Sequence, residues 1–361
     1  MSWIKREIHL ENGNIAKAQS PYIISASRST DIPAFYSDWF FHRLEKGYSA
    51  WINPFNGEKS YVSYQDVRFI VFWSKNPKPL LEHIHKLNMY KPHINCYIQY
   101  TLNDYEAEGL EKGVPSLNER IETFKVLTDK LGKGHVIWRF DPLILTDSIS
   151  INTLLKKIEK IGDNLVGYTE KLVFSFADIE SYRKVKTNLI HNNIYYNEWS
   201  EESMIEFAQR LSLLNKSKGW NYILSTCGEK SIFKEFDIDA NRCIDDNLMI
   251  RFAWKDDILM NFLGVKIYSK DSTMNLFDQT EKIPEKAILL DDKKHYAVKS
   301  KNNTDKGQRI LCGCVVSKDI GEYNTCPHQC EYCYANTSKE TAITNYNRHK
   351  LNPYSETITG K

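Results

Sequence analysis

Short apolar runs that end in polar residues alternate along the chain with longer stretches of helical periodicity. Runs rich in β-branched and aromatic residues are predicted to be strands. They span residues 22–28, 68–74, 95–101, 135–141, 171–177 and 221–227. The stretches predicted to be helices span residues 33–46, 79–90, 116–131, 150–161 and 201–217. In the third of these, Ser116 and Glu119 have the spacing of a helix-capping box.

This alternation predicts an α/β fold with parallel strands joined by right-handed crossovers. The near-continuous apolar strands suit a sheet that is covered on both faces. A partly closed (β/α)6 barrel of the TIM type fits, and so does a doubly wound sheet. We expect a βα-barrel core over residues 1–230, an irregular insertion or linker over 231–310, and a C-terminal segment over 311–361 that packs on the barrel.

Polar side chains at the carboxyl ends of the strands are the first candidates for a site, because ligands bind at that edge of a parallel sheet. The candidates are Arg28, Lys75, Asn76, Gln99, Arg139, Asp141 and Ser175. Arg139 and Asp141 are the strongest, since a charge within an apolar strand needs a partner. Polar strand ends are also typical of residues that simply meet solvent.

Composition excludes several classes of protein. Of 361 residues, 42% are hydrophobic and 26% charged, and the formal net charge is +2, so there is no bulk attraction to nucleic acid or membrane. The longest apolar run, "FIVFW", is far shorter than the roughly 20 residues of a spanning helix. The N-terminus, "MSWIKREIHL", has charges where a signal peptide needs an apolar core. We therefore expect a cytoplasmic protein with reduced thiols and no membrane partner.

Three of the eight cysteines stand close together in "NTCPHQCEYCYAN". Cys326, Cys330 and Cys333 have the spacing Cys-x3-Cys-x2-Cys, which can hold three irons of a [4Fe–4S] cluster and leave the fourth iron open to a cofactor or substrate. Thiolates also suit zinc, but a structural zinc site usually has four ligands. The three-cysteine loop therefore favours the cluster.

Four further cysteines predict a second site. Cys312 and Cys314 form a tight Cys-Gly-Cys pair, Cys227 ends the last predicted strand, and Cys243 lies in "RCIDD". Together they supply the four thiolates of an auxiliary [4Fe–4S] cluster or of a zinc ion. The alternative is that Cys227 and Cys243 are small buried hydrophobic residues. Cys96, inside a predicted strand, is interpreted as a core residue.

The cysteine loop resembles the signature of the radical S-adenosylmethionine (SAM) enzymes, which have an aromatic residue just before the third cysteine, here Tyr332. "CEYCYAN" is most similar to the spore photoproduct lyase branch. The resemblance implies a [4Fe–4S] cluster whose open iron binds SAM, cleavage of SAM to a 5′-deoxyadenosyl radical, and Tyr332 packed near the adenine. It also implies a flavodoxin- or ferredoxin-type electron donor and hints at a nucleotide or nucleic-acid substrate. On this interpretation Lys75, Asn76, Arg139 and Asp141 act on substrate or SAM, and Arg28, Gln99 and Ser175 bind the cofactor.

A second resemblance covers nearly the whole chain. "SRSTDIPAFY", "VFWSKNP", "WRFDPLIL" and "CGCVVSKDIGEYNTCPHQCEYCYAN" resemble a bacterial family catalogued as domain of unknown function 1848. In radical SAM enzymes the cysteine loop follows the first strand, whereas here it follows six predicted strands. We therefore expect a permuted topology with a helix after Ala335 and the loop at the barrel mouth.

Two alternative functions remain: a non-catalytic zinc-stabilised binding module, and an iron–sulfur redox or sensor protein that does not use SAM.

Overall fold

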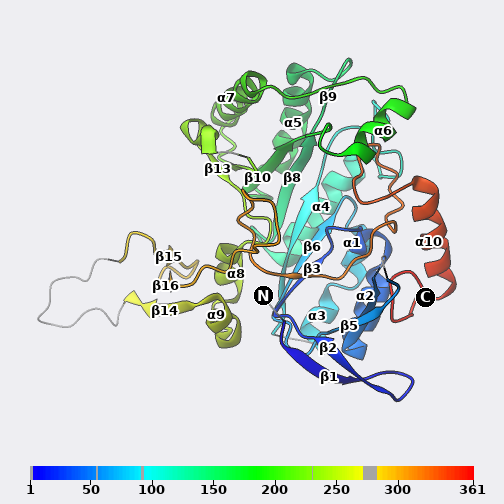
Figure 1. Ribbon diagram of the computed structural model, residues 1–361. Helices are drawn as coiled ribbons and strands as arrows, with labels where there is room; N and C mark the ends of the chain where they lie inside the picture. Colours follow the sequence, from blue (N-terminus) through cyan, green and yellow to red (C-terminus); the bar gives the residue numbers. More distant parts are fainter. Residues whose placement is uncertain (1–2, 54–55, 91–92, 230, 271–282) are drawn as a thin grey trace, which may run out of the picture.

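The protein has an α/β fold built on one large parallel sheet (Figure 1). The structure is a computed structural model that describes residues 3–53, 56–90, 93–229, 231–270 and 283–361. Eight strands form the sheet in the order β13-β12-β10-β8-β7-β6-β3-β17, and every neighbouring pair is parallel. Their bounds are β3 Ile23–Ala26, β6 Phe69–Ser74, β7 Asn95–Thr101, β8 Val136–Leu143, β10 Lys171–Phe176, β12 Ile223–Thr226, β13 Ile238–Ala240 and β17 Lys318–Asp319. The six predicted strands are all present.

The strands from β3 to β13 follow one another in space as they do along the chain. A doubly wound sheet would reverse its strand order at a switch point, so that alternative is wrong. Successive residues of each strand face opposite sides. Ile24, Ile70 and Ile98 belong to one hydrophobic core, and their neighbours Phe69 and Tyr97 belong to another.

The crossover helices supply the first of these cores. They are α1 Ile32–Phe35, α2 Ser37–Lys46, α3 His85–Tyr90, α4 Leu117–Leu131, α5 Ile151–Leu165, α6 Arg183–His191 and α7 Glu201–Ser217. The predicted helix over 79–90 is divided between the 3₁₀ helix η1 (Lys78–Glu82) and α3. Ser116 caps α4 by accepting a hydrogen bond from the Glu119 N–H, as its spacing predicts. Within the described residues, no helix combines the length and the apolarity needed to cross a membrane.

The other face of the sheet is covered by elements that the sequence did not reveal. Met249 and Ile250 of α8 (Asp246–Ala253) and Leu259 of α9 (Asp257–Leu263) pack there with Cys243 and Cys314. A small antiparallel sheet follows, with β14 Val265–Ser269, β15 Ile288–Leu289 and β16 His295–Lys299 in the order β14-β16-β15. With η2 (Ser231–Phe236) and β13, these elements make the described parts of residues 231–310, namely 231–270 and 283–310, more regular than the sequence suggested.

A second sheet lies at the N-terminus, in the order β1-β2-β5-β4. Its strands are β1 Lys5–His9, β2 Ile15–Gln19, β4 Tyr48–Ile52 and β5 Lys59–Ser63, and the short strands β9 Leu145–Thr146 and β11 Tyr196–Asn197 pair elsewhere. Ile8 is the only buried residue of β1. A strand this exposed leaves no alternation of apolar and polar residues to detect.

The C-terminal segment returns to the start of the main sheet. The predicted helix over 33–46 is broken at Tyr36, between α1 and α2, where φ is −134° and the buried hydroxyl donates to the carbonyl oxygen of Thr325 at 2.5 Å. After the cysteines comes α10 (Lys339–Leu351), the helix expected after Ala335. Figure 1 shows α10 beside α1 and α2, and the rings of Tyr36 and His349 lie 4.6 Å apart.

Candidate functional site

Asp319 anchors the C-terminal segment at the carboxyl end of β3. Its carboxylate accepts hydrogen bonds from Ser25 Oγ at 2.9 Å, Ser27 Oγ at 2.7 Å and the Arg28 backbone N–H at 2.7 Å. Two residues on, Gly321 approaches the same strand so closely that an added Cβ would lie 2.7 Å from the Cβ of Ser27. These contacts fix the start of the cysteine-bearing segment next to Arg28.

The cysteine loop, residues 326–333, lies against the segment that follows β7. Cys330 forms an isolated antiparallel bridge with Glu111, and the Gly113 N–H donates to the carbonyl oxygen of His328 at 2.9 Å. A Cβ on Gly113 would lie only 2.6 Å from that oxygen. The close backbone approach therefore requires glycine at this position.

A buried polar network holds the loop to the strand ends. Lys75 Nζ, just after β6, donates to Glu111 Oε1 at 2.8 Å and to the Tyr332 hydroxyl oxygen at 2.8 Å. The Tyr332 hydroxyl also donates to Glu111, and Asn103 Nδ2 donates to Glu111 Oε1 at 3.0 Å. Burial alone would raise the pKa of Glu111, but the charges of Lys75 and Arg120 outweigh it and lower this pKa to about 2. Glu111 is therefore a buried anion with two cationic neighbours.

Asp31 makes a second link between the loop and the sheet. Its Oδ2 lies 2.8 Å from His328 Nε2 and accepts the Lys75 backbone N–H at 2.8 Å, while Oδ1 caps α1 through the Ala34 N–H at 3.0 Å. His328 Nδ1 lies 3.0 Å from the carbonyl oxygen of Gly113. Both ring nitrogens of His328 thus face oxygen acceptors, one on the sheet side and one in the segment after β7.

The thiols of Cys326, Cys330 and Cys333 are free; Cys330 belongs to the protein core, Cys333 packs against it, and Cys326 is half-buried. Burial raises the pKa of Cys326 far above that of an ordinary thiol, and Asp31 and the other two thiols raise it further. Burial also raises the pKa of Cys330. Three thiolates could be held together here only by a cationic centre that compensates their charge.

The donor set of the loop fits an iron–sulfur cluster, because thiolates are its usual ligands and each cysteine binds a different iron. The fit rests on donor chemistry and burial. Within the described part of the chain, no group of three or more His, Cys, Asp or Glu side chains is arranged to hold a metal ion as it stands. Two surface hollows of about 160 and 580 Å³ are lined by other residues, around Thr146 and around Lys156.

The second cysteine group brings Cys227, Cys243, Cys312 and Cys314 together from three chain segments. The Sγ atoms of Cys227 and Cys243 lie 3.2 Å apart, and Cys314 Sγ accepts the Cys243 backbone N–H at 3.3 Å. The hydrogen bond with Cys227 lowers the pKa of Cys243, and the one with Cys314 lowers the pKa of Cys312 to about 6. In contrast, burial alone raises the pKa of Cys96 to about 12, as suits a core residue.

Arg139 links this second group to the end of β8. Its guanidinium donates to Asp141 Oδ2 at 2.5 Å, to Gln99 Oε1 at 3.2 Å and to Cys243 Sγ at 3.2 Å, and it lies 5.3 Å from the centroid of the Trp73 ring. Arg139 and Asp141, the two charged residues of this apolar strand, are therefore paired with each other, as expected. The Asp141 backbone N–H donates to Asn103 Oδ1 at 2.9 Å, so this residue also contacts the network under the cysteine loop.

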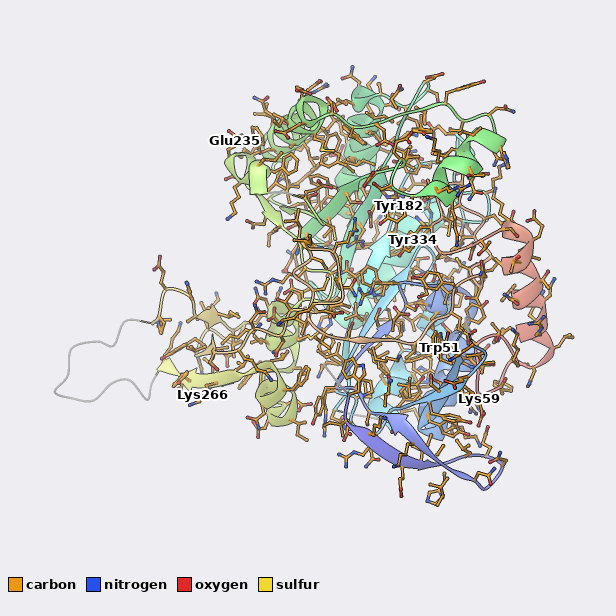
Figure 2. All side chains as sticks on the ribbon, viewed as in Figure 1. Trp51, Lys59, Tyr182, Glu235, Lys266 and Tyr334 are labelled. Carbon is orange, nitrogen blue, oxygen red and sulfur yellow. The ribbon has the colours of Figure 1, made fainter. Side chains whose placement is uncertain are left out.

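Tyr334 covers the outer side of the loop. It follows Cys333, and its hydroxyl donates to the carbonyl oxygen of Arg28 at 3.0 Å. Figure 2 shows Tyr334 beside Tyr182, with the ring centroids 6.0 Å apart. Tyr334 thus contacts both the segment after β3 and the segment after β10.

The residues selected from the sequence fall into two sets in the structure. Lys75 and Tyr332 meet at the cysteine loop, and Arg28 lies beside Asp319. The second set, around the second cysteine group, contains Gln99, Arg139, Asp141 and Ser175. Asn76 donates its backbone N–H to Ser74 Oγ at 2.9 Å, and among the described residues its side chain makes no hydrogen bond to either set.

Sequence reasoning missed Glu111, Arg120 and Asp319. Glu111 lies in a loop and Arg120 on the buried side of α4, so neither follows a strand directly. Asp319 belongs to a strand of two residues. The one available signal was the general rule that a largely buried charge such as Lys75 needs an opposite charge nearby. That rule does not say which acidic residue supplies the charge.

The fold and the site define an α/β protein whose parallel sheet carries two groups of cysteines at the carboxyl ends of its strands. The chain belongs to the family described as "Domain of unknown function (DUF1848)", whose model matches residues 23–335. The match extends from β3 through all three cysteines of the loop. No curated protein matches the chain.

Proposed function

We propose that this protein is a radical-SAM-like enzyme in which Cys326, Cys330 and Cys333 hold a [4Fe–4S] cluster. The observation that carries the proposal is the position of the loop. Three free thiols, that of Cys330 buried and those of Cys326 and Cys333 half-buried, lie at the carboxyl ends of β3, β6 and β7, where Asp31, Lys75 and Glu111 hold the loop. This is the edge of a parallel sheet at which active sites form.

The strand order supports a partial barrel of six βα units with permuted topology. β17 pairs with β3, so the loop leaves the sheet beside the first barrel strand although it comes last in the chain. The helix α10 follows the loop and packs beside α1 and α2. We infer that β17 and α10 take the places that the strand before the loop and the helix after it have in the radical SAM enzymes.

When bound, the cluster would supply the electron that cleaves SAM into methionine and a 5′-deoxyadenosyl radical. The chain's own residues position the site. Lys75 and Tyr332 hold the loop on the sheet, and Glu111 balances the charge of Lys75. Asp141 and Arg28 lie where the strand ends meet the loop, and we propose that they contact SAM or the substrate.

Gln99 and Ser175, expected at the cofactor, have protein partners in the structure. Gln99 accepts from Arg139 at 3.2 Å and donates to the carbonyl oxygen of Cys243 at 2.9 Å, and Ser175 donates to Asp141. We propose that both are positioning residues, which orient Arg139 and Asp141. A nucleotide or nucleic acid as substrate, a flavodoxin- or ferredoxin-type donor and a cytoplasmic location complete the proposal.

The test is an anaerobic reconstitution of the full chain with iron and sulfide, followed by reduction with dithionite in the presence of SAM. We expect about four irons per chain at the loop and release of 5′-deoxyadenosine. Replacing Cys326, Cys330 and Cys333 with serine should abolish both, whereas Cys96→Ser should change neither. Zinc at the loop and no bound iron would support the zinc-stabilised binding module. A cluster without SAM cleavage would support a redox or sensor protein.

A further inference from the structure

The second cysteine group has a backbone that is fixed from several directions. The carbonyl oxygen of Cys243 accepts from the Tyr97 hydroxyl at 2.8 Å and from Gln99 Nε2 at 2.9 Å. The carbonyl oxygen of Cys314 accepts the Asp305 N–H at 2.8 Å. Buried thiols that served only as apolar filling would need no such convergence of three chain segments.

The sulfur atoms of this group also have their own hydrogen-bond donors. Cys314 Sγ accepts from the backbone N–H groups of Cys243 at 3.3 Å and Ile244 at 3.4 Å. Cys243 Sγ accepts from Asn241 Nδ2 at 3.2 Å and from Arg139 at 3.2 Å. N–H donors directed at sulfur stabilise the thiolate form, and such outer contacts are typical of metal-binding thiolates.

Positive charge surrounds the group. The guanidinium of Arg139 contacts Cys243, and Arg309 interacts electrostatically with Cys227 and Cys312. The Cζ of Arg309 lies 3.6 Å from the position that a Cβ would take on Gly228, next to Cys227. Four thiolates around a divalent cation carry a net charge of −2, and Arg309 and Arg139, the latter shared with Asp141, offset part of it.

We propose that Cys227, Cys243, Cys312 and Cys314 form a second metal site, independent of the cysteine loop, that binds one thiophilic divalent cation such as Zn²⁺. The short distance between the Cys227 and Cys243 sulfur atoms favours a single metal ion over a cubane iron–sulfur cluster. Sulfurs at the corners of a tetrahedral zinc site lie about 3.8 Å apart, since each Zn–S bond is about 2.3 Å. The Cys227 and Cys243 sulfurs, 3.2 Å apart, need only a small movement to reach that spacing. A cubane distributes its four thiolates over four irons and therefore spreads them further apart.

The four sulfurs form a chain of neighbours in the structure, from Cys227 through Cys243 and Cys314 to Cys312. Binding therefore requires side chains to turn about their Cα–Cβ bonds until all four point at one centre. Cys227 and Cys312 are half-buried and can make this turn more easily than the buried Cys243 and Cys314. The bound ion would join the ends of β12 and β13 to the segment that leads into β17, and so would fix the path by which the cysteine loop reaches the sheet.

The experiment measures metal per chain in the full-length protein after dialysis, together with the absorption of the Co²⁺-substituted form. We expect about one zinc per chain and the charge-transfer and ligand-field bands of a tetrahedral cobalt thiolate. Cys312→Ser should lose both, and Cys96→Ser should keep both. The chain with Cys326, Cys330 and Cys333 replaced by serine should also keep both, which separates this site from the proposed cluster.

Alkylation of the wild-type chain provides a readout that does not depend on a variant folding. With zinc bound, all four thiols should resist iodoacetamide until a chelator is added, as followed by peptide mass spectrometry. A folded wild-type chain that binds neither zinc nor cobalt would overturn the proposal. So would a Cys227–Cys243 disulfide, or a loss of iron and sulfide in Cys312→Ser, since the latter would make the site a second cluster.

Discussion

Lys75 and Tyr332, separated by 257 positions in the sequence, meet at 2.8 Å beneath the cysteine loop. The same ammonium group contacts Glu111 at 2.8 Å. These two contacts join the end of β6 to the C-terminal segment. They also explain why a lysine can be largely buried at a strand end, because its charge is paired with the buried carboxylate of Glu111.

Lys75→Met is expected to lower the free energy of unfolding by about 3 kcal/mol, because it leaves the buried charge of Glu111 with Arg120 as its remaining cationic neighbour. Urea denaturation measures the change. The matched control is Lys186→Met, which breaks an exposed, solvent-screened pair with Glu180 and should change the free energy of unfolding far less. Adding Glu111→Gln to Lys75→Met should recover part of the loss. Equal losses for the two lysine variants would contradict the role given to this pair.

Gly113→Ala should displace the cysteine loop, because the new methyl group would lie 2.6 Å from the carbonyl oxygen of His328, and a backbone atom cannot turn aside. Overpacking of this kind costs about 1–3 kcal/mol. The expected result is lower iron content after reconstitution, measured together with the midpoint of urea unfolding. Gly307→Ala is the control, since a Cβ at Gly307 would meet only a side-chain oxygen of Asp305, at 3.3 Å. Unchanged iron content in Gly113→Ala would show that the loop is not seated as described.

Glu322 should make the protein less stable as the pH rises. Burial raises the pKa of this carboxyl from 4.5 to about 7, and its Oε1 is a buried atom without a hydrogen-bond partner among the described residues. Between these two pH values the Glu322 carboxyl binds more protons in the folded chain than in the unfolded chain. The stability that Glu322 contributes is therefore fully present below pH 4.5 and is lost as the pH rises through 7. The loss is at most about 3 kcal/mol.

Glu322→Gln removes this titration, so the variant should be more stable than the wild type at pH 8 and similar to it at pH 4.5. Urea unfolding of both chains at the two pH values measures the difference. Because other groups titrate equally in both chains, the comparison isolates Glu322. A stability difference that does not change with pH would disprove the assignment.

The sequence predicted the main sheet well, because its strands are buried on both faces and therefore have strong apolar runs. The predicted strand over 95–101 has the bounds of β7. The N-terminal sheet escaped detection since β1, with the sequence "KREIH", buries only Ile8. The break at Tyr36 was also missed, because it depends on a hydrogen bond to Thr325, and no periodicity of α1 and α2 reveals a partner 289 residues away.

Several residues of the candidate site could be selected from the sequence, but the contacts that bring them together could not. Arg139 and Asp141 were selected because they are charges in an apolar strand, and the structure pairs them. The grouping of Cys227 and Cys243 with Cys312 and Cys314 followed from counting thiols, and the structure brings these residues together. Glu111 could not be selected, because its role arises only when Lys75, Arg120 and Tyr332 converge on it from three chain segments.

The most direct test of the central claim is an electron paramagnetic resonance spectrum of the reduced, anaerobically reconstituted chain, recorded with and without SAM. The proposal predicts the signal of a reduced [4Fe–4S] cluster that changes when SAM is added, and that is absent when Cys326, Cys330 and Cys333 are replaced by serine. A cluster signal that is identical with and without SAM would contradict an open iron occupied by that cofactor.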